Sequence, residues 1–362
     1  MKKMIKLFDP VVDSREKKII QKVLKSHFWA SGSGLGFVRK FEDDFNKYLG
    51  SDYCVAVNNG TSALHLALSL HNVRNKEVII PSLSFVSTAH SVVYNGGKPI
   101  FADIDPQTLC LDTDDIKKHI SKKTAVIMPV HFAGMPCNLD GIRDICEESG
   151  TVLIEDAAHA SGSSYKGKKI GVHGKAVCFS FHPVKNLAMP TGGAIALNGS
   201  SSNTSKKILD SRRWCGISNR KEFVYDVSCL GWNYYMNEFS AAIGIEQLKK
   251  LDRLNGLRKR IAKRYFNEIE TNDKMPYNDG CSYHFYWILV KNRSHFMKKM
   301  KQNGVETGIH YRPIHKMQFY KNNRRKLPHT DYMAERIVSL PTHPNLSHSD
   351  VDKIVKLVNS FS

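Results

Sequence analysis

The stretch of sequence that decides the fold contains two apolar runs and the loop between them: Ala176-Val177-Cys178-Phe179-Ser180-Phe181-His182-Pro183-Val184-Lys185-Asn186-Leu187 and then Gly193-Ala194-Ile195-Ala196-Leu197. Apolar runs of this length are typical of buried strands, and the loop is short enough to make the two strands neighbours in a sheet. The loop carries Lys185. Read alone, it is a surface lysine on a turn. Near a bound aldehyde, a desolvated lysine amine can form a Schiff base.

Upstream of this pair, similar apolar runs alternate with helical segments. The runs cover residues 53–57, 77–81, 99–103, 124–130 and 151–156. Continuous apolar strands alternating with helices are typical of a parallel or mixed sheet covered on both faces. The first two thirds of the chain therefore predict a large α/β domain.

The last third predicts a smaller α+β unit. A long helix is expected from residue 237 to about residue 254, followed by a strand over 283–290 and a closing helix over 350–358. The 362 residues exceed the ~100–200 residues of an ordinary single domain. We therefore expect a large domain over residues 1–250 and a small C-terminal domain over residues 251–362.

Composition excludes some protein classes. No run approaches the ~20 apolar residues that span a bilayer, and the first residues lack the apolar stretch of a signal peptide, so we expect a cytoplasmic protein without a membrane anchor. The eight cysteines include no C-x-x-C pair, which favours reduced thiols and no metal site. The net charge of +19 is scattered and favours anionic small molecules, while nucleic-acid or membrane-surface binding stays as an alternative.

Two further polar groups follow strands, at the edge of an α/β sheet where ligands bind. Gly60, Thr61 and Ser62 precede a helix, where free N–H groups and hydroxyls suit a phosphate, although an ordinary helix cap is the better explanation when this segment is read alone. Asp156 ends an apolar strand. Its carboxylate either caps a helix or faces a cationic heteroatom such as a protonated pyridine nitrogen.

The Lys185 loop, the segment 60–62 and Asp156 each have an ordinary structural explanation, but together they fit the binding of one ligand. Ser180 adds a hydroxyl to the phosphate cradle, and His159 is placed to contact a ring or to be a core histidine. A phosphate cradle, a carboxylate for a ring nitrogen and an amine for an aldehyde are what pyridoxal 5′-phosphate (PLP) requires. We therefore predict PLP as the cofactor, with Lys185 as its Schiff-base lysine.

At this point the sequence resembles the DegT/StrS family of PLP-dependent nucleotide-sugar aminotransferases. The resemblance covers nearly the whole chain and rests on residues 59–64, 81–89, 129–134, 152–160, 180–187, 192–194, 231–238, 308–315 and 339–344. It implies a fold-type I transferase whose large domain holds a mixed, mostly parallel seven-stranded sheet sandwiched by helices. It also implies a homodimer with active sites at the subunit interface.

The resemblance assigns further roles. Phe85 matches the aromatic residue that stacks on the pyridine ring, and Asn233 matches the asparagine that reaches the PLP phosphate of the other subunit. The expected substrate-side residues are Tyr235, His310, Tyr311 and His315. Arginines at 212, 213 and 312 are further candidates for contacts to a pyrophosphate.

The function implied is transfer of an amino group, with glutamate as the expected donor, to a nucleotide-linked keto-sugar, such as a 4-keto-6-deoxyhexose, for cell-surface glycans. Alternatives are a PLP-dependent sugar dehydratase, whose relatives carry histidine in place of Lys185, and a non-catalytic regulatory or nucleic-acid-binding relative. The chain departs from the common family pattern at Tyr235, at Ala188-Met189-Pro190 and at His159, where many members have glutamine. Histidine there resembles the branch that aminates C4 of UDP-4-keto sugars.

Overall fold

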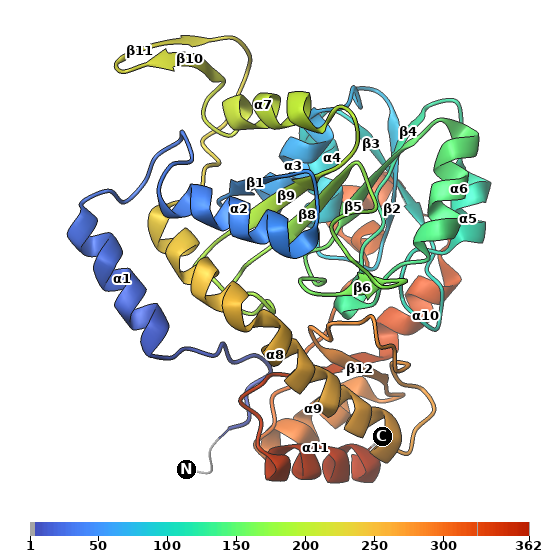
Figure 1. Ribbon diagram of the computed structural model, residues 1–362. Coiled ribbons are helices and arrows are strands. Elements are labelled where there is room, and N and C mark those ends of the chain that lie inside the picture. Colours follow the sequence, from blue (N-terminus) through green and yellow to red (C-terminus); the bar gives the residue numbers. More distant parts are fainter. Residues whose placement is uncertain (1–3, 324, 362) are drawn as a thin grey trace.

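A seven-stranded sheet forms the centre of the computed structural model, which describes residues 4–323 and 325–361 (Figure 1). The strand order is β1-β9-β8-β5-β4-β2-β3. Strand β9 runs antiparallel to both β1 and β8, while the other pairs are parallel. The strands are β1 (Tyr53–Val57), β2 (Glu77–Pro81), β3 (Lys98–Ala102), β4 (Thr124–Ile127), β5 (Val152–Asp156), β8 (Ala176–Ser180) and β9 (Gly193–Leu197).

Helices cover both faces of this sheet. Alternate residues of each strand point to opposite faces, so Ala56 lies in one apolar core and Val57 in the other. The first core also takes residues of α2, α5, α6 and α8, and the second takes residues of α3, α4 and α7. The helices are α1 (Ser14–Ser26), α2 (Phe37–Leu49), α3 (Gly60–Ser69), α4 (Ser87–Tyr94), α5 (Thr113–His119), α6 (Leu139–Ser149), α7 (Ser202–Arg212), α8 (Glu238–Glu268), α9 (Arg293–Gln302), α10 (Pro328–Arg336) and α11 (His348–Phe361).

The C-terminal part packs α9, α10 and α11 around a two-stranded antiparallel sheet of β12 (Tyr286–Leu289) and β13 (Ile337–Leu340), below the large sheet in Figure 1. Helix α8 is longer than the sequence predicted, because buried residues such as Ile261 and Tyr265 continue its apolar face beyond residue 254. Strand β12 begins later than predicted, since Tyr283 has a positive φ of 48° that no strand accommodates. Helix α8 crosses residue 250, so the division into 1–250 and 251–362 stays a proposal.

Smaller elements complete the fold. Short antiparallel pairs join β6 (Ser164–Tyr165) to β7 (Lys168–Lys169), and β10 (Ile217–Lys221) to β11 (Val224–Val227). The β10–β11 hairpin projects from the body near α7 (Figure 1). Within the described ranges, no helix combines the length and the apolar character needed to span a membrane. All eight cysteines are free and six of them are buried.

A buried ion pair ties α7 to α2 and β1. Arg213 is 2% exposed, and its guanidinium pairs with Glu42 and donates to the carbonyl of Ala56 at 2.8 Å. The same Glu42 carboxylate accepts the N–H of Ala56 at 2.8 Å, so one buried acid serves two elements. Arg213 therefore has a structural role and does not contact a pyrophosphate. Arg212 likewise points to the carbonyl of Ser69.

Replacing Glu42 should destabilise the fold strongly. Glu42→Ala leaves the Arg213 charge buried beside only the half-exposed Asp210, and we expect a loss of about 3–5 kcal/mol in the free energy of unfolding. Asp43→Ala is a matched control on the next residue of the same helix, because its pair with Arg39 is exposed and contributes about 0.5 kcal/mol or less. Urea unfolding followed by circular dichroism measures both. Equal losses in the two variants would contradict this role of Glu42.

Candidate active site

The site is a cavity of about 390 Å³ at the carboxyl ends of β5 and β8. Its walls come from the N-terminus of α3, the start of α4, the loop after β5, the loop between β8 and β9, and one residue of the C-terminal part. The residues that line it are Asn59, Gly60, Thr61, Leu64, Ser84, Phe85, Ser87, Thr88, Val130, Asp156, Ala158, His159, Ser180, His182, Val184, Lys185, Thr191, Gly192 and Tyr311. Most of the cofactor residues predicted from the sequence are therefore brought together.

One end of the cavity is formed by the first turn of α3. The side chain of Asn59 caps this helix by accepting the N–H of Ser62 at 2.9 Å. A Cβ on Gly60 would lie 2.7 Å from Cβ of Ser180, so only glycine lets the helix start approach β8 this closely. The free N–H groups of a helix N-terminus then lie beside two hydroxyls, those of Thr61 and Ser180, which is an arrangement suited to a phosphate.

Ser62 is the exception among the predicted phosphate residues. It is buried, its hydroxyl donates to Oδ1 of Asn58 at 2.7 Å, and it does not line the cavity. Ser87 takes a place that the sequence did not predict, because its hydroxyl lies 2.7 Å from that of Thr61 at the cavity wall. A serine at the start of a helix is too common a feature to have indicated this.

Asp156 lies at the base of the cavity with its carboxylate buried. Oδ2 accepts the hydroxyl of Thr88 at 2.9 Å, and Oδ1 accepts the N–H of Ala158 at 3.1 Å. Burial raises the pKa of Asp156, and these two hydrogen bonds with the charge of Lys185 offset only part of that effect. A cationic N–H group facing this carboxylate would restore its charge.

Lys185 projects from the loop between β8 and β9, and its amine lies in a desolvated setting. Nζ lies 3.5 Å from Nε2 of His284, a residue that the sequence did not single out. Burial lowers the pKa of Lys185 to about 8, and the charge of Asp156 opposes the shift. A lysine in this setting is deprotonated far more readily than an exposed lysine, which is the property that a nucleophilic or proton-transferring amine needs.

His159 and Tyr311 form a further wall. The N–H of Ala133 donates to Nδ1 of His159 at 3.3 Å, so the ring proton is on Nε2, which lies 3.0 Å from the hydroxyl of Tyr311. Burial lowers the pKa of His159 well below its ordinary value, and the ring is therefore neutral. Phe85 lies at the rim, 57% exposed, with its ring centroid 6.1 Å from that of Tyr311.

The remaining predicted residues lie outside the cavity lining. His315 is buried and bonds to Ser82 at 2.7 Å, with Asp331 at 3.2 Å, so its ring is occupied in packing α10 against the sheet edge. His310 lies behind Tyr311 and bonds to Ser339 at 2.7 Å. The segment with Asn233 and Tyr235 forms single bridges to Trp214 and to Val57, and Asn233 is exposed.

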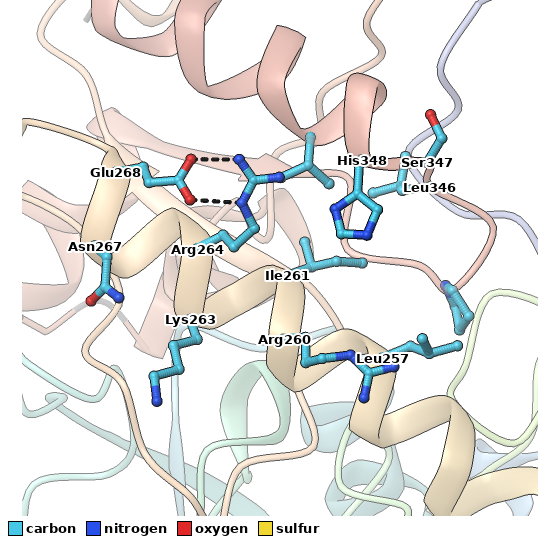
Figure 2. Close-up of a pocket in the computed structure, with 12 residues that line it drawn as sticks. Leu257, Arg260, Ile261, Lys263, Arg264, Asn267, Glu268, Leu346, Ser347 and His348 are labelled. Atoms are coloured by element: carbon cyan, nitrogen blue, oxygen red, sulfur yellow. Dashed lines mark hydrogen bonds and ion pairs between the residues drawn. The ribbon is translucent and has the colours of Figure 1, made fainter.

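A second cavity of the same volume lies between α8 and α11, away from these residues (Figure 2). Arg264 on its wall is neutralised by two hydrogen bonds of 2.6 Å to Glu268 and one of 2.7 Å to Asp352. Lys263 and Arg260 of α8 also line it (Figure 2). None of its lining residues is a buried acid, base or nucleophile without a partner, so the cavity around Lys185 is the candidate active site.

Comparison with known proteins then decides the family. A model of the DegT/DnrJ/EryC1/StrS aminotransferase family matches residues 10–359. The chain belongs to this family. The enzymes of the family use PLP, and the membership confirms both the predicted cofactor and the predicted aminotransferase activity.

Individual relatives agree with this assignment. PseC of Helicobacter pylori, an aminotransferase involved in the biosynthesis of pseudoaminic acid, is 27% identical, with a TM-score of 0.92 over 99% of each chain. The sugar aminotransferase CalS13 of Micromonospora echinospora is 28% identical, with a TM-score of 0.92 over 99% of this chain and 100% of its own. Protein MJ1066 of Methanocaldococcus jannaschii is 32% identical over 98% of this chain and 96% of its own. The fold-type I α/β fold is therefore confirmed, and the protein is a sugar aminotransferase.

The cavity fits PLP on its own geometry. The close approach of Gly60 and Ser180 makes a phosphate cradle at one end. The buried carboxylate of Asp156 is suited to a cationic N–H group such as a protonated pyridine nitrogen. The Lys185 amine lines the same cavity. The desolvation of Lys185 and of Asp156 is costly unless a ligand uses both groups. A bound PLP would do so.

Proposed function

We propose that this enzyme transfers an amino group from glutamate to a nucleotide-linked keto-sugar, such as a 4-keto-6-deoxyhexose, with Lys185 as the cofactor lysine. The observation that carries the proposal is a desolvated lysine amine sharing one cavity with a buried carboxylate and a helix N-terminus. The description of PseC as an aminotransferase of pseudoaminic acid biosynthesis supports a sugar on the acceptor side.

Bound PLP supplies an aldehyde for the amino groups and a ring that draws electrons from the bonds at the donor's α-carbon. In our proposal, Nζ of Lys185 takes up the proton from that carbon and delivers it to the carbon that carried the cofactor's aldehyde. In the second half of the reaction, Nζ takes a proton from that cofactor carbon and delivers it to the sugar carbon that receives the amine. A pKa of about 8 suits a group that must both accept and release a proton near neutral pH.

Asp156 holds the ring nitrogen in its protonated form in this proposal. Thr88 assists by donating to Oδ2, which favours the charged carboxylate over the neutral acid. Gly60, Thr61 and Ser180 hold the phosphate, with Ser87 next to Thr61. Phe85 covers one face of the ring, and His159 with Tyr311 contributes a hydrogen-bonded wall on the substrate side.

The nucleotide is expected to bind outside the cavity, where the net charge of +19 favours a pyrophosphate. Arg312 is exposed on the loop that carries Tyr311, and of the three arginines considered it is the one still able to take this role. His315 is left with a packing role because Ser82 and Asp331 engage both of its ring nitrogens, whereas His310 bonds to Ser339 through Nδ1 and stays a candidate on the substrate side.

A homodimer with shared active sites is part of the proposal. The projecting β10–β11 hairpin and the segment after it expose large apolar side chains, with Phe223 90%, Leu230 80% and Val224 75% exposed. Apolar groups gathered on a projecting element are characteristic of protein interfaces. Asn233 follows this hairpin in the sequence, and in our proposal it reaches the phosphate of the PLP bound in the other subunit.

Turnover with defined substrates tests the proposed activity. We expect the purified enzyme with glutamate to convert at least one of the UDP-, dTDP- or GDP-linked 4-keto-6-deoxyhexoses into an amino-sugar, with one 2-oxoglutarate formed for each amine. Mass spectrometry of both products measures this ratio, and Lys185→Ala is the inactive control. Equal turnover of the free keto-sugar would contradict the requirement for a nucleotide.

Removing the Thr88 hydroxyl should weaken PLP binding. Thr88→Val deletes the hydrogen bond to Asp156 and so raises the pKa of Asp156 further. The carboxyl group is then more often neutral, and a neutral acid does not stabilise the protonated ring nitrogen of PLP. We expect the dissociation constant of PLP to rise about tenfold to a hundredfold. Thr88→Ser keeps the hydroxyl and serves as the control in the same absorbance titration. An unchanged constant in Thr88→Val would exclude this assistance.

Hybrid dimers test the shared site. Lys185→Ala and Asn233→Ala damage different parts of one site, so a dimer of one variant with the other contains one intact site and one doubly damaged site. Random exchange of subunits should restore about one quarter of the wild-type activity from two nearly inactive parents. A mixture that stays as inactive as its parents would show that Asn233 serves its own subunit or no active site.

A further inference from the structure

His284 lies two residues before β12 and lines a further, very small cavity next to the active site. This cavity has a volume of about 10 Å³, enough for a single water molecule, and it is also lined by Phe8, Asp9, Arg258 and His343. Val184 and Lys185 line both cavities, so they form the wall between them. Lys185 therefore has the cofactor cavity on one side and the His284 cluster on the other.

The ring of His284 is fixed by packing and forms a hydrogen bond with Lys185. It stacks on Phe8 with the ring centroids 5.1 Å apart and the planes 20° from parallel, and the centroid of His159 lies 4.7 Å away. Nδ1 is buried without a hydrogen-bond partner in the described part of the chain, whereas Nε2 lies 3.5 Å from Nζ of Lys185. A protonated lysine amine only donates, so Nε2 is the acceptor and the ring proton is on Nδ1.

Arg258, on α8, contributes a buried positive charge to the same small cavity. It is 6% exposed, its guanidinium donates a hydrogen bond of 3.3 Å to Asn255, and no carboxylate of residues 4–323 or 325–361 forms an ion pair with it. Burial lowers the pKa of His284 well below its ordinary value, and the charge of Lys185 lowers it further, with smaller contributions from His159, His310 and Arg258. The imidazole is therefore held in its neutral form.

We propose that His284 is a positioning residue that holds the Lys185 amine by accepting its hydrogen bond at Nε2. The proposal rests on the proposed role of Lys185 as the cofactor lysine. A carboxylate in the place of His284 would hold the amine as a fixed cation, and an apolar side chain would give it no fixed direction. A neutral acceptor directs the amine and leaves it able to lose its proton.

Other titratable groups around Lys185 are compatible with this role. The charge of Asp156, at the end of β5, raises the pKa of Lys185. Three further histidines, His159, His182 and His310, interact with the charge of Lys185. Burial lowers the pKa of each of these three histidines, with the charge of Lys185 adding to the effect. The hydrogen bond to Nζ of Lys185 comes from none of these groups in the described residues but from His284.

Chemical labelling of Lys185 in the full-length protein, stripped of cofactor, tests the proposal without any turnover. Competitive acetylation across a pH series, read by mass spectrometry of the Lys185 peptide, gives the pKa of this amine. His284→Phe keeps the aromatic packing on Phe8 but removes the acceptor, and we expect the pKa of Lys185 to fall by about half a unit to one unit. His284→Gln keeps an acceptor and should stay close to wild type.

The controls separate hydrogen bonding from packing. His343→Gln changes the same small cavity without touching Lys185 and should leave the pKa of Lys185 unchanged. Equal shifts in His284→Phe and His284→Gln, or no shift in either, would overturn the role of His284.

Failure of the proposed function is seen separately, because borohydride would then fix PLP to a lysine other than Lys185 or to none.

Discussion

The desolvated amine of Lys185, facing one buried carboxylate, is the constraint on which the rest of the site depends. Burial alone penalises both charges, so the protein supports each with a specific contact: Thr88 and Ala158 donate to Asp156, and His284 faces Lys185. The antiparallel pairing of β8 with β9 provides the short loop that carries the amine. The parallel pairing of β5 with β8 places Asp156 beside it.

The sheet and the centre of the site could be predicted from the sequence because both depend on local patterns. Apolar runs of five residues define strands, and Asp156, Lys185 and Gly60 each follow or precede such a run. The three polar groups together indicated the cofactor, and the family resemblance then indicated the reaction. Helix α8 was predicted too short because its apolar face alternates with many lysines and arginines, which hide the buried positions.

Contacts between distant segments could not be predicted. Thr88 reaches Asp156 across 68 residues, and Lys185 reaches His284 across 99 residues. Such residues have no local signature, since a threonine in a helix or a histidine before a strand is ordinary. The same limit made Arg213 look like a ligand for phosphate, because its partner Glu42 lies 171 residues away. Ser62 and His315 were predicted as site residues because they adjoin site residues in the sequence. The structure shows that the side chains of both are hydrogen-bonded inside the protein.

The central claim is that Lys185 is the amine that holds PLP, and chemical reduction tests it most directly. The holoenzyme is treated with borohydride, digested, and searched by mass spectrometry for the peptide that retains the cofactor. Our account predicts that the label lies on the peptide of residues 176–197, at Lys185, and that prior incubation with glutamate prevents the labelling. A label on any other lysine, or equal labelling after glutamate, would contradict it.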